Sequence, residues 1–222
     1  MTNVLVVAAH PDDEVIGCGG TLARHSAQGD RVDIIFLADG ESSRTATPDM
    51  IEKRQLMAGK AAQILGCQNP SFLGLPDNQL DTLPFLQLVQ ALENAAMPLL
   101  PEIVYTHHGG DLNLDHRLAC QATLTAFRPQ PSSSVQAIYA FEIASSTEWN
   151  HPSVSTPFIP NRFHDITAWM QLKTLALACY GNEMRSPPHS RSLEGIQYRD
   201  FWRGHTVGHQ AAEAFDVLRE IW

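Results

Sequence analysis

The chain has 222 residues, of which 44% are hydrophobic and 18% charged, values that suit one soluble globular domain spanning residues 1–222. Its net charge of −9 comes from 15 basic and 24 acidic side chains, with no local cluster of Lys and Arg, which disfavours binding to nucleic acid or to an anionic membrane surface. The sequence has no apolar run of about 18 residues and enters a strand-like segment at once, so we expect a cytoplasmic protein without a membrane span.

Strand-like and helix-like segments alternate along the first two thirds of the chain. Continuous apolar runs indicate strands buried on both faces of a parallel sheet, and we predict strands over residues 3–9, 31–38, 71–73, 103–106 and 135–142. Between them, we predict helices over residues 15–28, 49–65, 83–96 and 114–127, the first two ended by Gly29 and Gly66.

The last third of the sequence is less regular. Residues 143–160 are rich in Ser, Thr and Pro and predict an irregular segment, whereas helices are predicted over 167–180, 190–204 and 207–219. Short strand–helix repeats imply right-handed parallel crossovers, so the expected fold class is α/β, a Rossmann-like three-layer α/β/α sandwich with a mostly parallel sheet. Because ligands bind outside the carboxyl ends of such strands, the loops at 10–14, 39–44 and 107–116 are expected to meet.

The most distinctive motif is Ala-His-Pro-Asp-Asp-Glu at residues 9–14, directly after the first predicted strand. Its three adjacent carboxylates repel one another unless a cation is present, and His10 and Asp13, three residues apart at a helix start, can face one point. The competing structural interpretation is a helix N-terminus whose dipole attracts acidic side chains. That interpretation accounts for one or two carboxylates but not for the His-Pro pair, so the motif favours a metal site.

A second motif, Asp-Leu-Asn-Leu-Asp-His-Arg at residues 111–117, follows another predicted strand. His116, at the start of the next helix, would complete a set of two imidazoles and one carboxylate, which leaves positions open for water and substrate as in catalytic zinc sites. The same set also suits Fe²⁺ or another divalent metal. His107 and His108 are interpreted as loop histidines, and the four widely spaced cysteines as small core residues of a reducing compartment.

Together, the two motifs resemble those of the LmbE/PIG-L family of zinc-dependent deacetylases, and the resemblance extends over nearly the whole chain. Weaker similarities include the Gly-Leu-Pro-Asp turn at residues 74–77. Members of this family remove an acetyl group from N-acetylglucosamine-type sugars. The resemblance implies zinc bound by His10, Asp13 and His116, with Asp12 as the general base that activates the attacking water.

The resemblance also implies roles for neighbouring residues. Arg54 matches a position that often contacts the substrate, and Asp115 matches a residue behind the metal ligands. Asn113 stands where some members carry a histidine that assists the tetrahedral intermediate, which leaves the second oxyanion donor unidentified. The implied partner is a small amino-sugar substrate, and homo-oligomer formation is left open.

A mechanism also follows from the residues without the family. A bound divalent metal lowers the pKa of water from about 16 to about 7, and Asp12 would take a proton as this water attacks the amide carbonyl. His189, which follows two prolines, is either the acid that protonates the leaving amine or a loop histidine. Glu14 either supports a ligand or favours the helix start, and Arg54 and Arg44 are the cations nearest this edge in sequence.

Three aromatic residues late in the chain are less informative. Trp149 is interpreted either as a platform for a sugar ring or as a packing residue. Trp202 and Phe215 have the character of core residues.

Three other functions share features with this sequence. A dinucleotide-binding protein also has a glycine-bearing strand–helix turn, but the Gly-x-Gly-x-x-Gly spacing is absent, and the glycines at 17–20 lie within the predicted helix. Carboxylates also occupy the place where a pyrophosphate would bind, so these glycines are better explained by close packing of helix on sheet. A metal-binding scaffold without turnover is disfavoured by Asp12, whereas an amidase acting on a non-sugar conjugate stays open.

Overall fold

The computed structural model describes residues 1–43, 47–131 and 133–221. Within these residues, seven strands form one sheet in the order β3-β2-β1-β4-β5-β7-β6. Strands β1 to β5 run parallel, and β7 is antiparallel to both of its neighbours. The strands are β1 (Asn3–Ala8), β2 (Arg31–Ala38), β3 (Ser71–Leu75), β4 (Ile103–His107), β5 (Ala137–Phe141), β6 (Arg162–Asp165) and β7 (Ala212–Glu220).

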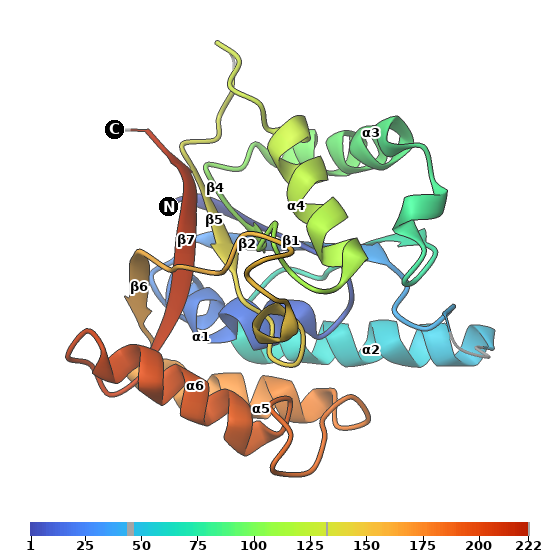
Figure 1. Cartoon of the computed structure of the whole chain (residues 1–222). Coiled ribbons are helices and arrows are strands. Elements are labelled where there is room, and N and C mark those ends of the chain that lie inside the picture. The colour runs from blue at the N-terminus through green and yellow to red at the C-terminus, as the bar shows by residue number, and fades with distance from the viewer. Residues whose placement is uncertain (44–46, 132, 222) are drawn as a thin grey trace.

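Helices cover both faces of the sheet (Figure 1). Helices α1 (Asp13–Ala27) and α2 (Pro48–Leu65) pack on one face, and α3 (Phe85–Ala96) and α4 (Leu114–Ala126) on the other. Helix α5 (Met170–Cys179) packs against α1 and α2, and α6 (Leu193–His205) contacts β7. The predicted three-layer sandwich is thus confirmed, with α5 and α6 as an added outer cover. Short 3₁₀ helices are η1 (Leu80–Thr82), η2 (Met97–Leu99), η3 (Thr147–Trp149) and η4 (Thr167–Trp169).

The central strand β1 shows why its sequence is apolar without alternation. Val4 and Val6 are buried in the core beneath α1 and α2, whereas Leu5 and Val7 are buried in the core beneath α3 and α4. A strand covered on both faces needs apolar side chains at every position. The carboxyl end of β1 therefore lies in the middle of the sheet, between the cores, and the motif at residues 9–14 begins there.

Helix α1 approaches the sheet closely at its glycines, as the sequence predicted. A Cβ atom on Gly17 would lie 2.4 Å from the Phe141 ring, and one on Gly20 would lie 2.8 Å from Ile166. The helix is kinked at Cys18. The backbone N–H of Gly20 donates to the Glu213 carboxylate at 2.9 Å, so an acid from β7 caps the helix just beyond its kink.

The helix predicted over residues 207–219 is wrong, because β7 occupies most of this segment. Its alanines, glutamates and Leu218 favour a helix by local propensity. In the structure, pairing with β5 and β6 satisfies the backbone, and the buried carboxylate of Glu213 bonds to α1. Strand β6 lies after the segment predicted to be irregular and was not predicted. Phe215 is fully buried as expected, but Trp202 is 65% exposed and is not a core residue.

All four cysteines are free thiols, and Cys18 and Cys120 are buried, as expected of core residues. Among the helices of the described segments, none is both long enough and apolar enough to span a membrane.

Candidate active site

The motif after β1 forms a tight turn that aims its carboxylates inward. Asp12 has a φ of +131°, a strained backbone for a residue with a side chain. Its N–H donates to the Glu14 carboxylate at 3.0 Å, and the Tyr180 hydroxyl donates to the other Glu14 oxygen at 2.6 Å. Glu14 is fully buried, so it supports the backbone of this turn in addition to lying in the first turn of α1.

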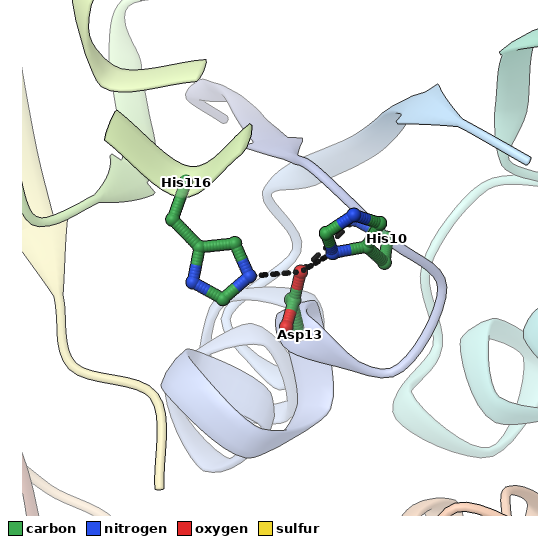
Figure 2. A group of neighbouring side chains, drawn as sticks. All are labelled: His10, Asp13 and His116. Carbon is green, nitrogen blue, oxygen red and sulfur yellow. Dashed lines mark hydrogen bonds and ion pairs between the residues drawn. The ribbon is translucent and has the colours of Figure 1, made fainter. Parts of the chain in front are cut away.

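His10, Asp13 and His116 point toward one another from the turn after β1, the start of α1 and the start of α4 (Figure 2). One oxygen of Asp13 lies 3.3 Å from Nδ1 of His10 and 3.4 Å from Nε2 of His116. His116 is in the first turn of α4, which is capped by Asn113: its side-chain oxygen accepts the N–H of Asp115 at 2.8 Å. The fold thus brings together two motifs that are about a hundred residues apart, as the sequence predicted.

These three side chains fit a divalent metal. One donor atom from each lies within 4.8 Å of the others. A tetrahedral zinc ion with bonds of about 2.0–2.1 Å separates its ligand atoms by about 3.3–3.4 Å, close to the two separations from Asp13. Two imidazoles and one carboxylate are also donor groups that zinc and ferrous iron accept.

Carboxylates lie behind both histidines. The Nε2 atom of His10 is 3.1 Å from Asp115 and 3.2 Å from Asp77, and Nδ1 of His116 is 3.2 Å from Asp111. Such carboxylates orient ligating histidines in metal sites and make them more basic. A second group of possible metal ligands consists of His10, Asp77 and Asp115. One oxygen of Asp115 is already engaged, because it accepts the Leu80 N–H at 3.1 Å.

The charges of the site depend on these contacts. Burial opposes a charge on His10, but Asp115 and Asp13 outweigh it and raise the pKa of His10 to about 10. For His116, burial is likewise outweighed by Asp13 and Asp111, and its pKa rises to about 9. Burial raises the pKa of Asp12 to about 6, with Arg191 opposing the shift. Both histidines are therefore protonated near neutral pH without a metal, and a metal would have to displace these protons.

A cavity of about 90 Å³ lies over the three candidate ligands. Asp12 reaches it from one side, and Arg191 lies 3.4 Å from Asp12. Arg54, buried as well, pairs with Glu183 at 3.1 Å and with Glu41 at 3.5 Å. Arg54 is also among the residues that line the cavity.

Four further residues with polar side chains line the cavity but were not identified as site residues from the sequence. Glu183 and Arg191 lie between α5 and α6, and Asp77 and Asn78 follow β3. The Gly-Leu-Pro-Asp turn was a signal for Asp77. The Arg191 position had only its nearness to His189 as a signal.

Other candidates lie in less direct positions. His189 is not among the described residues that line the cavity; its Nδ1 accepts the Arg191 N–H at 3.0 Å, and its ring meets the edge of Trp149. His107 was interpreted as a loop histidine, which is wrong: it is the last residue of β4 and fully buried, and its Nε2 accepts the Ala9 N–H at 2.8 Å. Arg44, one of the two cations nearest this edge in the sequence, lies outside the described residues.

Comparison with known proteins is consistent with this arrangement. The PIG-L family, described as GlcNAc-PI de-N-acetylase, matches residues 5–127. The chain belongs to the PIG-L family. An uncharacterized deacetylase of Escherichia coli K12, YaiS, is 30% identical over 168 residues, which cover 73% of this chain and 81% of that protein. The family resemblance and the hydrolytic N-deacetylase class inferred from the sequence are thus confirmed.

Solved structures share the PIG-L fold. The N,N'-diacetylchitobiose deacetylase of Pyrococcus horikoshii matches with a TM-score of 0.77 and 21% identity, over 97% of this chain and 83% of that one. At this identity, the match shows the fold alone. GalB, the 4-carboxy-2-hydroxymuconate hydratase of Pseudomonas putida KT2440, matches with a TM-score of 0.75 and 25% identity, over 98% and 96% of the two chains. One fold thus serves different reactions, and the substrate must be argued from the site.

Proposed function

We propose that this PIG-L protein is a divalent-metal-dependent deacetylase, with zinc as its metal, that removes the acetyl group from an N-acetylglucosamine-type sugar. His10, Asp13 and His116 would hold the metal. The observation that carries the proposal is the placement of Asp12, a buried carboxylate that shares a cavity with all three candidate ligands. The description of the matching family, GlcNAc-PI de-N-acetylase, supports an amino-sugar substrate.

When bound, the metal would supply Lewis-acid activation of water and of the amide carbonyl. Asp12 would then act as general base, accepting a proton from the attacking water at a carboxylate oxygen. In the metal-free protein, burial raises the pKa of Asp12 to about 6, so its carboxylate is mostly ionised at neutral pH and can accept a proton. Glu14 and Tyr180 fix the turn that carries it, so little reorganisation is needed.

Asp12 would pass its proton to the leaving amine. His189, the other acid considered from the sequence, is turned toward Trp149 and the backbone of Arg191, so Asp12 serves both steps in this proposal. Asn113 is an unsuitable oxyanion donor, because its side chain already caps α4 and donates to Asn78 at 3.1 Å. Arg191, beside Asp12, is the better placed cation to stabilise negative charge in the cavity.

The test is release of acetate from a panel of N-acetylated sugars in free, nucleotide-linked and oligomeric forms, with zinc-loaded and chelator-treated protein. We expect at least one sugar to be deacetylated, and chelator to abolish the reaction. Silence on every sugar, with one metal ion still bound per chain, would contradict the sugar substrate and favour another amide.

A further inference from the structure

A second cavity lies on the face of the sheet that α1 covers, beside the last turn of that helix. It has a volume of about 380 Å³, and we call it the α1–β6 pocket. None of its described lining residues lines the catalytic cavity. The residues used below are Arg24 and His25 of α1, Tyr105 of β4, Tyr139 of β5, and Arg162 and His164 of β6.

The lining of the α1–β6 pocket is basic, although the chain as a whole has a net charge of −9. Two arginines and two histidines line it, and no acidic residue is among the described lining residues. The dipole of α1 favours cations in its last turn, which accounts for Arg24 and His25. It does not account for Arg162, which comes from β6 and adds a like charge to the same cavity.

The charge of Arg24 is not neutralised by an ion pair. Within the described segments, no carboxylate pairs with its guanidinium. Its Nη1 donates only to the backbone carbonyl of Asp165, at 3.4 Å, and the group lies 5.9 Å from the centre of the Trp169 ring. Arg24 therefore keeps donors that an anion in the pocket could use.

Arg162 is held in place by one acid and one imidazole. Its Nη1 donates to Glu220 at 2.6 Å and its Nε donates to His164 at 3.1 Å. Its Nη2 makes no hydrogen bond with the rest of the described chain. Because an arginine has five N–H donors in a fixed fork, the guanidinium is oriented by two bonds and retains others for a ligand.

The two histidines report the same positive potential. His25 is fixed between Asp30 and the Tyr105 hydroxyl, at 2.9 Å from each. Burial lowers the pKa of His164 to about 3, and the charges of Arg162, His25 and Arg24 add to the shift. The three groups that oppose a proton on His164 favour a negative charge at the same place.

The size and floor of the α1–β6 pocket suit a small molecule. Its volume falls in the range of about 300–1,000 Å³ that is typical of ligand sites. Buried aromatic rings of Tyr105 and Tyr139 form part of its lining, and such rings favour contact with a flat carbon skeleton. Carboxylates and phosphates are the anions that guanidinium groups bind through paired hydrogen bonds.

We propose that the α1–β6 pocket binds a small organic anion, whose carboxylate or phosphate group pairs with Arg24 and Arg162 and whose carbon skeleton lies against Tyr105 and Tyr139. This site is separate from the catalytic cavity and does not depend on the proposed deacetylase function. Helix α1 connects the two, because Asp13 begins it and Arg24 lies in its last turn, roughly 16 Å away at 1.5 Å per residue.

The experiment is calorimetry on metal-free protein with phenyl phosphate, benzoate and benzyl alcohol, which share a ring but differ in charge. We expect saturable binding of at least one of the two anions, which identifies the preferred group, and none of the neutral alcohol. Arg24→Gln should raise Kd for that anion about tenfold or more. Arg191→Gln removes a cation that lines the catalytic cavity, so it is the matched control and should bind as wild type does.

NMR of the same metal-free protein locates the bound anion. Saturation should shift the signals of His25 and His164 and leave those of His10 and Asp13 in place. Absence of saturable binding of both anions would overturn the proposal. So would equal affinity in wild type and Arg24→Gln, or affinity that is lost in Arg191→Gln with shifts confined to the catalytic cavity.

Discussion

Asp12 is the side chain on which the proposed chemistry depends most, and its position is set by its neighbours. The Glu14 carboxylate holds its backbone N–H, and Arg191 faces its oxygens at 3.4 Å. Burial raises the pKa of Glu14 to about 8 even though the Tyr180 hydrogen bond favours its ionised form. The turn is therefore built from groups that are costly to bury, which is typical of a site kept for function rather than stability.

The first prediction concerns the base itself. Asp12→Asn keeps the shape of the side chain but cannot accept a proton, so kcat should fall roughly 10²–10⁴-fold on whichever sugar is deacetylated. Metal content and melting temperature should stay close to wild type, because Asp12 is not among the three candidate ligands. Acetate release at a near-normal rate by the metal-loaded variant would remove Asp12 from the role of base.

Site residues within one short motif could be predicted from the sequence, whereas contacts between residues far apart in the sequence could not. His10, Asp13 and His116 were predicted because each lies in a dense motif directly after a strand. Arg191 was missed as a partner of Asp12 because 179 positions separate them and nothing in the local sequence marks the contact. Its position results from packing of the segment between α5 and α6.

Among the elements, α1 is the one whose sequence is most constrained by packing. It begins with Asp13, one of the three candidate metal ligands, and then passes close to β5, where Gly17 faces Phe141. Helical glycine is unfavourable by about 1 kcal/mol relative to alanine, so its presence here reflects the space available. The close approach keeps the start of α1 against the carboxyl end of the sheet.

A pair of glycine substitutions tests this constraint. Gly17→Ala places a Cβ atom 2.4 Å from the Phe141 ring and should lower the free energy of unfolding by about 1–3 kcal/mol. Gly59→Ala, in α2, meets nothing within 4 Å and should stabilise by up to about 1 kcal/mol. Urea denaturation of both variants measures the two effects. Equal shifts in the same direction would show that packing is not the reason for Gly17.

The elements also differ in how far the sequence predicts them. Strands β1, β2 and β4 are covered on both faces and carry continuous apolar runs, so their existence could be predicted. Strand β7 contains residues with high helix propensity, and half of it is only partly buried. Its strand conformation depends on pairing with β5 and β6, which are remote in sequence, and tertiary contacts override propensity in such cases.

For the molecule as a whole, the candidate site joins two parts of the chain. The region that matches the family, residues 5–127, contains the three candidate ligands and Asp12. Glu183 and Arg191 complete the cavity from the C-terminal third. Residues from both parts of the chain thus line one cavity.

The half-buried His164 of edge strand β6 lies 3.4 Å from the hydroxyl of Thr21 in α1. The ring of His164 packs 4.8 Å from that of Phe215, and its Nε2 accepts a hydrogen bond from Arg162 at 3.1 Å. Burial lowers the pKa of His164 to about 3, and the nearby charges of Arg162, His25 and Arg24 add to the shift. The folded protein therefore keeps this imidazole neutral where an unfolded chain protonates it.

The sign of the resulting pH dependence follows from linkage. With a folded pKa of about 3 and an ordinary value of 6.5, the contribution of His164 is fully present above pH 6.5 and is lost as the pH falls toward 3. At about 1.4 kcal/mol per pH unit, the loss of stability between pH 7 and pH 5 is on the order of 2 kcal/mol.

We predict that metal-free His164→Gln loses less stability between pH 7 and pH 5 than metal-free wild type, by about that amount, in urea denaturation at both pH values. His151→Gln, at an exposed histidine, is the control and should follow wild type. Protonation of His10 and His116 affects all three proteins alike. Identical pH dependence in wild type and His164→Gln would therefore contradict the lowered pKa of His164 in the folded protein.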